Sequence, residues 1–289
     1  MEETALRAQI LVEALPYIRA FADTTVVIKY GGAAMIDPEM KRAVLQDLVL
    51  LRYVGIKPVL VHGGGPEVSA LMRRLGREPE FRGGLRVTDA ETMEVAEMVL
   101  GGRVNKDLVD GLQRAGGRAV GLSGKDDRTI LARKMVEHDG QPVDLGFVGE
   151  IVSINPDLIA MLVESGYIPV LSSVGVGEDG ASYNINADHL AGRLAAELQA
   201  AKFIALTDVP GLLEDPSDES TLIRRLSARE VRARIADGRI SGGMIPKLEG
   251  CLMASDGGVE RVHILDGRLP HAMIMELFTD TGVGTLIQR

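Results

Sequence analysis

Two glycine turns, each at the end of a short apolar run, constrain the fold of this chain more than any other feature. One is the Lys-Tyr-Gly-Gly segment 29–32, which ends the β-branched run 24–29, and the other is the His-Gly-Gly-Gly segment 62–65, which follows the apolar run 56–61. Glycine lets backbone N–H groups approach an anion closely, because no Cβ intervenes. Taken alone, either turn is equally well an ordinary strand–helix connection. Two of them in consecutive strand–helix units indicate phosphate binding at the ends of neighbouring strands.

Apolar runs and helical patterns alternate along the rest of the chain. We expect strands at 24–29, 56–61, 118–122, 167–171, 203–207, 261–265 and 285–287. We expect helices at 1–22, 38–54, 89–115, 156–165, 187–199, 227–236 and 244–255, and an antiparallel pair at 130–136 and 147–154. Continuous apolar strands separated by helices are typical of an α/β protein whose mainly parallel sheet is covered on both faces. Ligands bind at the carboxyl ends of the strands in such sheets, which is where both glycine turns fall.

Two segments suggest how the chain is organised. Residues 1–22 form an amphipathic pattern with apolar residues three and four apart, and Pro16 predicts a kink within it. This helix packs either on its own domain or, as an arm, on another subunit. The glycine-rich residues 173–180 are the best candidate for a flexible connection between two lobes, which we place at 23–177 and 178–289.

Composition limits the classes of function. The net charge of −9 argues against nucleic acid as the main partner, because binding to its phosphates depends on Lys and Arg. The single Cys251 excludes an intramolecular disulfide and fits a reducing compartment. The chain starts with Glu2 and Glu3 rather than a basic leader, and no apolar run approaches the ~18 residues of a membrane span. We therefore expect a cytoplasmic protein that does not bind membranes.

Charged and amide side chains further along the chain are candidate ligands for a carboxylate. Arg86 stands in a glycine-flanked loop and is suited to clamp a carboxylate through two N–H groups. Arg82 is the competing choice, and a solvated surface charge is the ordinary alternative for both. In the segment 184–188, Asn184 and Asn186 share one face and Asp188 falls in the first turn of a helix. Asn186 is equally suited to cap that helix.

Two more glycine-containing segments point to a nucleotide. Gly243 precedes a helix that carries Lys247 near its start, so the helix dipole and the ammonium add up to a cationic locus. Residues 207–212 form a strand end and a turn that suit a base and a ribose, although many turns look like this.

Three other features are less informative than they look. Residues 121–125 resemble a Walker loop, but the glycine spacing differs and Asp126 stands where that loop needs Ser or Thr. Residues 175–180 match G-x-G-x-x-G literally, but no helix follows directly and two acids would face the pyrophosphate. His62 has no second His at metal-ligand spacing, and we expect a structural role for it.

These motifs, in this order, resemble the amino-acid-kinase family, and the resemblance covers essentially the whole chain from Thr24 onward. It implies a three-layer sandwich around a mainly parallel sheet of about eight strands. The N-terminal lobe would bind an acyl acceptor and the C-terminal lobe ATP with Mg²⁺. Within the family, the closest similarity implies ATP-dependent phosphorylation of the γ-carboxylate of N-acetyl-L-glutamate to an acyl phosphate, in arginine biosynthesis.

The resemblance also assigns roles to individual residues. It implies that Lys29 and Lys247 stabilise the transferring phosphoryl group and that Asp188 orients both lysines. The residues implied to bind the acceptor are Gly64, Gly65, Arg86, Asn184 and Asn186. The residues implied to contact the nucleotide are Gly31, Gly32, Thr207, Asp208, Val209, Gly211, Leu212, Gly243 and Met244. No residue is expected to bind a metal ion directly.

Arginine-sensitive members of the family carry an extra N-terminal helix and a C-terminal signature. Residues 1–22 resemble that helix, and Lys202, His263, Glu276 and Gly282 match the signature. The resemblance implies feedback inhibition by L-arginine and a homohexamer, a trimer of dimers linked through N-terminal helices. Glu276 suits a guanidinium, although it could equally cap or solvate a helix end. Some family members bind a PII-type signalling protein, and the resemblance leaves open whether this chain does.

Several other functions compete with this one. A kinase for N-acetyl-aminoadipate differs by one methylene, which is worth only ~1–3 kcal/mol in selectivity. Uridylate and carbamate kinases share the fold, but Arg86 with the segment 184–188 suits an amino-acid derivative better. A non-catalytic arginine sensor has no use for the three charges of Lys29, Lys247 and Asp188. An NAD-dependent enzyme would need its glycine fingerprint at the first strand–helix turn, where this chain has Lys-Tyr-Gly-Gly.

Overall fold

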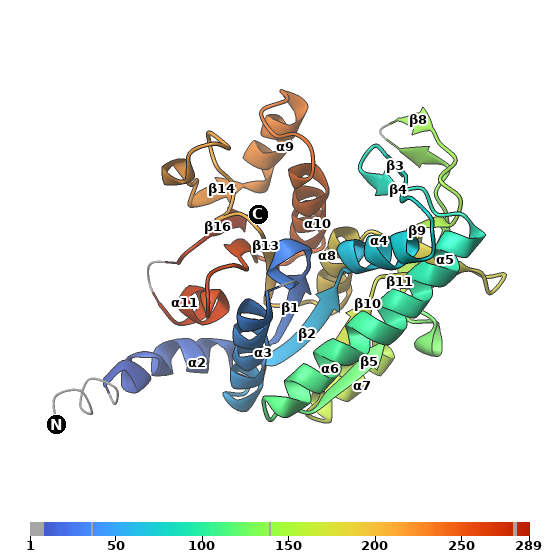
Figure 1. Cartoon of the computed structure of the whole chain (residues 1–289). Coiled ribbons are helices and arrows are strands. Elements are labelled where there is room, and N and C mark those ends of the chain that lie inside the picture. The colour runs from blue at the N-terminus through green and yellow to red at the C-terminus, as the bar shows by residue number, and fades with distance from the viewer. Residues whose placement is uncertain (1–8, 36, 139, 280–281) are drawn as a thin grey trace.

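The computed structural model describes residues 9–35, 37–138, 140–279 and 282–289, and its centre is a sheet of eight strands (Figure 1). The order across the sheet is β14-β16-β15-β13-β1-β2-β10-β5. The strands are β1 (Thr25–Tyr30), β2 (Lys57–His62), β5 (Ala119–Leu122), β10 (Ile168–Ser172), β13 (Lys202–Thr207), β14 (Arg225–Ser227), β15 (Arg261–Asp266) and β16 (Thr285–Gln288). Neighbouring strands run parallel, apart from β15 with β16. The expected mainly parallel sheet is therefore confirmed.

Helices cover both faces of this sheet, because successive side chains of a strand point to opposite sides. On one face, which is turned to the viewer in Figure 1, Ile28 and Leu60 pack among aliphatic side chains from the helices around them. These helices are α3 (Pro38–Tyr53), α4 (Gly65–Arg74), α5 (Ala90–Glu97), α6 (Asn105–Arg114) and α11 (Ala272–Phe278). On the other face, Val27 and Val61 pack in a second aliphatic cluster. Its helices are α7 (Asp157–Glu164), α8 (Ala187–Glu197), α9 (Ala228–Ala236) and α10 (Met244–Asp256).

A small closed barrel of four strands stands beside the main sheet. Its strands are β6 (Ile130–Lys134), β9 (Val148–Ile154), β11 (Val174–Val176) and β12 (Ser182–Ile185). β6 and β9 are the antiparallel pair that the sequence predicts. Two short hairpins lie near each other in Figure 1, β3 (Phe81–Arg82) with β4 (Leu85–Arg86) and β7 (Glu137–His138) with β8 (Gln141–Pro142). His138 connects them, because its Nε2 lies 3.2 Å from the Gly83 carbonyl oxygen.

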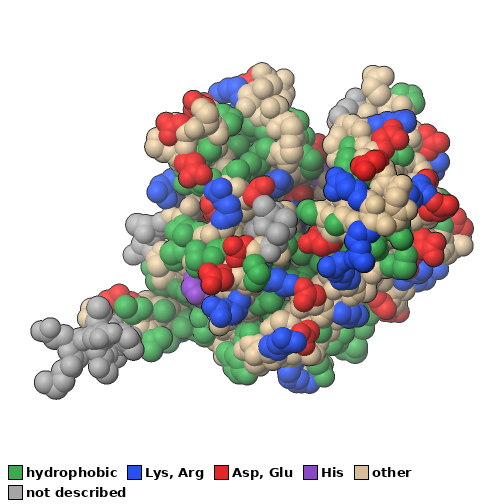
Figure 2. Space-filling view, in the orientation of Figure 1, with side chains coloured by type: hydrophobic (Ala, Val, Ile, Leu, Met, Phe, Trp, Pro, Cys, Tyr) green, Lys and Arg blue, Asp and Glu red, His purple; other side chains and the backbone are tan. Residues whose placement is uncertain are grey.

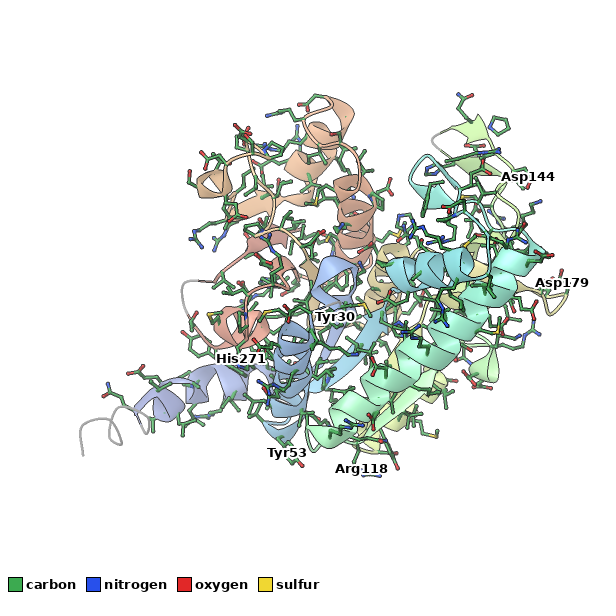
Figure 3. All side chains as sticks on the ribbon, viewed as in Figure 1. Tyr30, Tyr53, Arg118, Asp144, Asp179 and His271 are labelled. Carbon is green, nitrogen blue, oxygen red and sulfur yellow. The ribbon has the colours of Figure 1, made fainter. Side chains whose placement is uncertain are left out.

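The sequence predicts a flexible connection at residues 173–180, and this prediction is wrong for the first half of the segment, which forms a strand. Val174–Val176 is the buried strand β11, which pairs antiparallel with β12. Gly175 is needed for packing rather than for mobility, since a Cβ there would lie 2.5 Å from Ile185 Cδ1. Figure 3 shows Asp179 at the outer end of the turn that joins the two strands. The lobe boundary at 177/178 stays a prediction.

The predicted helix 89–115 is a continuous helix whose geometry changes in the middle. It begins at Asp89, whose side chain accepts a hydrogen bond from the Thr92 N–H as expected for an N-cap. Met98–Val104 is π-helical and leads into α6, so that the Asn105 N–H donates to the Leu100 carbonyl five residues before it. Such segments are rare and occur frequently at functional sites.

The N-terminal helix projects from the body of the molecule (Figure 1). Residues 9–13 are helical, Ala14 is a turn, and α2 (Leu15–Phe21) follows with Pro16 in its first turn. Proline has no N–H to donate and its ring crowds the preceding turn, so the predicted break is confirmed. Positions 1–8 of the predicted helix lie outside the described residues. Among the described helices, none combines the length and the apolar character needed to cross a bilayer.

Candidate active site

The two glycine turns meet at one edge of the sheet. β1 and β2 are parallel neighbours, with Lys29 opposite Val61 and Tyr30 opposite His62. The Gly63 N–H donates to the Tyr30 carbonyl at 3.0 Å, which joins the turns directly. A Cβ on Gly31 would lie 3.1 Å from Lys29 Nζ, so glycine keeps the space in front of this ammonium open.

A cavity of about 250 Å³ opens at this edge, between the two glycine turns and the segment that enters α8. Its wall consists of Lys29, Gly31, Gly32, Gly63, Gly64, Gly65, Val68, Phe81, Gly84, Leu85, Arg86, Leu100, Val148, Ser173, Asn184, Ile185, Asn186, Ala187 and Asp188. The structure therefore brings together Lys29, Asp188 and all five residues that the sequence analysis assigns to the acceptor. Their roles in binding stay predictions.

Lys29 and Asp188 form an ion pair in the wall of the cavity. Lys29 is only 6% exposed, and its Nζ lies 2.9 Å from Asp188 Oδ1. The contact is not aligned as a hydrogen bond, and Asp188 Oδ1 has no hydrogen-bond partner among the described residues. A buried ammonium without a counter-charge is costly, so Asp188 holds Lys29 in place. Asn186, which precedes α8, accepts hydrogen bonds from the N–H groups of Asp188 and His189 and so caps the helix.

Arg86 rather than Arg82 reaches the cavity. The Arg86 side chain is 8% exposed, and its Nη2 donates to the Gly65 carbonyl at 2.8 Å and to Ser69 Oγ at 2.9 Å. Burial and the nearby charge of Arg73 lower the pKa of Arg86 from its ordinary value. Arg82 is exposed and pairs with Glu80 instead.

Two residues that the sequence analysis does not single out support these groups. Thr88 is fully buried, and its hydroxyl donates to the Arg86 carbonyl at 2.8 Å and accepts from Asn184 Nδ2 at 3.3 Å. Thr88 therefore connects Arg86 with Asn184, two of the residues assigned to the acceptor. Ser69 orients the Arg86 guanidinium from α4. A small polar residue beside a charged one gives little signal in a sequence, because the contact forms only after folding.

α8 and α10 pack backbone against backbone next to this site. A Cβ on Gly192 would lie 2.0 Å from the Gly250 carbonyl oxygen, and a Cβ on Gly250 would lie 2.4 Å from the Asp188 carbonyl oxygen. A contact of His189 Nε2 with Glu249 Oε2, at 2.9 Å, also links the two helices. The helix that carries Lys247 is thereby held against the helix that carries Asp188.

Lys247 itself does not reach the cavity wall. Its Nζ donates to the Gly243 carbonyl at 3.2 Å, and within the described part of the chain it forms no ion pair with Asp188. Gly243 and Gly242 before it would each accept a Cβ without a contact within 4 Å, so the turn in front of α10 is open. The structure pairs Asp188 with Lys29, and the role of Asp188 in orienting both lysines stays a prediction.

The segment assigned to the nucleotide lies at the same edge of the sheet. Thr207 ends β13, which is the parallel neighbour of β1. Burial raises the pKa of Asp208, but hydrogen bonds from its own N–H and from Thr207, with the charges of Lys247 and Arg268, hold that pKa below its ordinary value. The Leu212 N–H donates to Thr285 Oγ1 at 2.9 Å, which fixes the turn that follows. Neither 121–125 nor 175–180 contributes to the cavity wall.

His62 supports the second glycine turn from inside the protein. The side chain is completely buried, its Nδ1 lies 2.7 Å from the Gly63 carbonyl oxygen, and its Nε2 lies 3.1 Å from Asn105 Nδ2. Burial lowers the pKa of His62 to about 4, so the ring is neutral at pH 7. The expected structural role fits this environment. Asn105 had a signal in the sequence, since it falls in the apolar stripe with Leu108 and Leu112.

We expect His62 to make stability depend on pH. The unfolded chain protonates this side chain below about pH 6.5 and the folded chain only near pH 4. The contribution of His62 is therefore present above pH 6.5 and is lost as the pH falls, by up to about 3 kcal/mol in the free energy of unfolding. Urea unfolding at pH values across this range measures the loss, and His62→Gln should show a smaller one. Equal losses in both proteins would contradict the assignment.

The four residues of the C-terminal signature gather in a second, larger cavity. It has a volume of about 870 Å³, and Lys202, His263, Glu276 and Gly282 all lie in its wall. Lys202 begins β13, whereas Thr207 ends it, so this cavity opens at the opposite edge of the sheet from the glycine turns. His263 Nδ1 lies 2.8 Å from Glu276 Oε1, and burial together with the charge of Arg261 lowers the pKa of Lys202 to about 8.

The last residue of the N-terminal helix, Phe21, packs against two cations in the wall of this second cavity. Lys202 Nζ lies 4.1 Å from the centre of the Phe21 ring, and Arg261 Cζ lies 6.0 Å from it. Cations over an aromatic face are attracted by its quadrupole. The helix is therefore coupled to the charges in the wall of the cavity.

Comparisons with known proteins agree with this architecture. The chain matches the amino acid kinase family over residues 24–266. It is 53% identical over 291 residues to the acetylglutamate kinase of Symbiobacterium thermophilum, which covers 99% of both chains. It is 54% identical over 283 residues to the acetylglutamate kinase of Moorella thermoacetica, which covers 96% of both chains.

Solved structures show the same fold. N-acetylglutamate synthase from Neisseria gonorrhoeae, in complex with coenzyme A and N-acetyl-glutamate, superimposes with a TM-score of 0.85 and 28% identity over 98% of this chain and 63% of that longer one. The same synthase in complex with coenzyme A and L-arginine gives a TM-score of 0.82 over 65% of its chain. Carbamate kinase from Giardia lamblia, at 17% identity, shares the fold with a TM-score of 0.67. The family match and the identity over nearly the full chain show that this protein belongs to the amino acid kinase family and, within it, to the acetylglutamate kinases.

Proposed function

We propose that the chain transfers the γ-phosphoryl group of ATP to the γ-carboxylate of N-acetyl-L-glutamate, in arginine biosynthesis. A bond forms between a carboxylate oxygen and the γ-phosphorus, the bond from that phosphorus to the ADP oxygen breaks, and an acyl phosphate results. The observation that carries this proposal is the 250 Å³ cavity, which is lined by the buried Lys29 with its partner Asp188 and by the buried Arg86. The relatives that match over almost the whole chain are acetylglutamate kinases.

The charges in this cavity suit a dicarboxylate acceptor. The γ-carboxylate has a reference pKa near ~4.3 and is already ionised at pH 7, so the reaction needs no general base. What it needs is relief of the repulsion between two anions, and phosphoryl transfer depends mainly on positioning and charge stabilisation. Lys29 and the bare amides of the glycine turns supply this at the reacting end. Arg86 and Asn184 would hold the α-carboxylate.

ATP would bind along the carboxyl ends of β13 and β1, with its phosphates toward Lys29. The open turn at Gly242 and Gly243 leaves room beside this edge. Mg²⁺ would enter with the nucleotide, since it is commonly held by substrate phosphates and few protein ligands. Bound there, it neutralises charge on the phosphates. Lys247 would complete the site by turning from the Gly243 carbonyl toward the γ-phosphate.

A direct assay separates this function from its rivals. The purified protein is incubated with ATP and Mg²⁺, and acyl phosphate is trapped with hydroxylamine. The acceptors compared are N-acetyl-L-glutamate, N-acetyl-L-aminoadipate, L-glutamate and L-aspartate. We expect the highest kcat/KM with acetylglutamate. A higher kcat/KM with acetylaminoadipate would show that the acceptor is the one that is longer by a methylene. If no acceptor gave a hydroxamate, a non-catalytic arginine sensor would be favoured over a kinase.

L-arginine would inhibit the enzyme by binding in the second cavity. Glu276 is the carboxylate for a guanidinium, and Lys202 with Arg261 is suited to a carboxylate. A structural neighbour of 27% identity was solved with L-arginine. Lys202 lies in the wall of the pocket, contacts Phe21 of α2 and begins β13, so a ligand there has a route along this strand to the sheet edge at Thr207.

We expect Glu276→Gln to weaken arginine inhibition strongly, by about 10- to 100-fold in the inhibitor concentration, because a charge-assisted hydrogen bond contributes about 1.5–3 kcal/mol. Activity without arginine should be unchanged. Initial rates against arginine concentration measure the effect, and Glu260→Gln on the exposed surface is the control. Inhibition of Glu276→Gln at the wild-type concentration would exclude this cavity as the inhibitor site.

The protein would assemble as a hexamer through its N-terminal helices. Ile10, Leu11 and Val12 are 55%, 73% and 68% exposed, and Figure 2 shows apolar side chains on this projecting segment. Such a face is expected to be covered by a second copy of the same helix. We expect Leu11→Glu to reduce the mass measured by light scattering from a hexamer to a dimer, with Glu13→Gln as a control. A hexamer in the Leu11→Glu variant would contradict this mode of assembly.

A further inference from the structure

The contacts of the buried His62 ring require a single tautomer. Its Nδ1 faces the Gly63 carbonyl oxygen at 2.7 Å, and since a carbonyl only accepts, Nδ1 carries the hydrogen. Its Nε2 faces Asn105 Nδ2 at 3.1 Å, and since an amide nitrogen only donates, Nε2 is the acceptor. The orientation of the Asn105 amide follows from its other contacts, because Nδ2 also faces two carbonyl oxygens, that of Val170 at 2.9 Å and that of Leu122 at 3.5 Å.

This hydrogen bond determines where the next amide points. The Gly63–Gly64 peptide is trans, so its C=O and N–H point in opposite directions within the peptide plane. With the carbonyl held toward the imidazole, the Gly64 N–H points away from the His62 ring. It makes no backbone hydrogen bond within the described chain. Gly64 lies in the wall of the cavity with Lys29, whereas His62 does not.

The π-helical segment also packs closely against Gly64. A Cβ on Gly64 would lie 2.6 Å from Leu100 Cδ2 and 3.3 Å from Val104 Cγ2. Asn105 follows directly, and its N–H donates to the Leu100 carbonyl in the five-residue step of a π-helix. This step stacks Leu100 over Asn105, so one helix face contacts Gly64 and His62 together. The long helix thereby fixes the glycine turn at two points.

We propose that His62 and Asn105 are positioning residues that hold the Gly63–Gly64 peptide so that the Gly64 N–H is aimed at an oxygen of the transferring phosphoryl group. This rests on the proposed function, because it names a donor for that reaction. The donor acts only if the peptide is held before the substrate arrives, since a preorganised dipole needs no reorientation during the reaction. The low pKa of His62 agrees with a neutral ring, and Lys106, whose Nζ donates to Asn105 Oδ1 at 3.2 Å, opposes a positive charge there.

The tautomer can be measured without any substrate. The chain has 5 histidines, so two-dimensional ¹H–¹⁵N spectra of protein labelled at histidine nitrogen contain few signals. We assign His62 by replacing the other histidines one at a time. The expected result at pH 7 is a neutral ring protonated at Nδ1. A ring protonated at Nε2, or an imidazolium, would overturn the proposal.

Kinetics of two matched variants test the consequence for catalysis. In His62→Asn, the side-chain amide nitrogen can take the place of Nδ1 and donate to Gly63. In His62→Gln, the polar end can reach the place of Nε2 instead. We expect His62→Gln to lower kcat at least roughly 10-fold, with the KM for the acceptor within about 3-fold, and His62→Asn to retain most of the turnover. Thermal unfolding of both variants shows whether either change is a loss of stability.

The outcomes separate this proposal from the function on which it rests. Equal kcat values in the two variants, or losses that follow their stability, would reduce His62 to a packing residue and overturn the proposal. If wild-type protein phosphorylates no acceptor, the proposed function fails and the donor role fails with it, while the tautomer measurement still decides the geometry of the turn.

Discussion

Lys29→Ala should lower turnover by about 10²–10³-fold, the loss typical for one preorganised group at a developing charge. The ammonium lies in the cavity wall, and a Cβ at Gly31 would come within 3.1 Å of it, so a reacting anion in front of Gly31 meets Lys29 directly. Because the charge acts mainly when the two anions approach, kcat should fall much more than the KM for the acceptor rises. Steady-state rates in the hydroxamate assay measure both.

The design of this experiment must account for Asp188. Removing Lys29 alone leaves a carboxylate at 15% side-chain exposure without its counter-charge, which destabilises the protein. Lys29→Ala combined with Asp188→Asn removes both charges, so a loss of turnover in the double variant reports on chemistry. Lys57→Ala, at the far end of the neighbouring strand, is a matched control and should keep its turnover. Near-normal turnover of Lys29→Ala would refute its role, and the same substitution at Lys247 is expected to give a similar loss.

Gly250→Ala should reduce both stability and turnover, although it adds one methyl group. The new Cβ would lie 2.4 Å from the Asp188 carbonyl oxygen and 2.7 Å from the Asp188 carbonyl carbon, and backbone atoms of a helix have little freedom to move away. Overpacking of this kind costs about 1–3 kcal/mol. A displacement of Asp188 by about 1 Å would lower turnover by about 10²-fold.

A second glycine-to-alanine change controls for helix propensity. Gly102 lies in the π-helical segment, is exposed, and would gain a Cβ with nothing within 4 Å. Alanine favours helices over glycine by about 1 kcal/mol, so Gly102→Ala should unfold at the same or a slightly higher urea concentration. Urea unfolding measures the stability of both variants, and the hydroxamate assay measures their turnover. A Gly250→Ala protein as stable and active as Gly102→Ala would show that the two helices can separate without consequence.

The sequence predicted the sheet well because the signal for each strand is local. The centres of these runs, such as 26–28 and 203–206, are apolar throughout, which is what burial between two layers of helices requires. The prediction of a flexible connection at 173–180 failed because it, too, was based only on local sequence. Its glycines indicate mobility in isolation, and only the fold shows that Gly175 lies against Ile185 and that Val174 and Val176 are buried.

The sequence predicted those site residues whose type is unusual for their position in a strand–helix turn. It did not predict residues whose importance depends only on where the folded chain places them. The glycine turns and the segment 184–188 stood out, and the structure brings them to one cavity. The choice between Arg82 and Arg86 depended on burial, which two arginines in one loop do not reveal. Thr88 and Ser69 matter only through hydrogen bonds to residues that are distant in the chain.

The glycine contact between α8 and α10 has a consequence for motion. Two helices that touch through side chains can slide, because rotamers change and absorb the shift. Here the Gly250 carbonyl stands where a Cβ of Gly192 would be, so sliding of α10 would drive backbone into backbone. The two helices are therefore one rigid unit. If Lys247 has the role proposed for it, its ammonium would approach the site by rotation of its own flexible side chain and through the open turn at 242–243, because α10 cannot slide along α8.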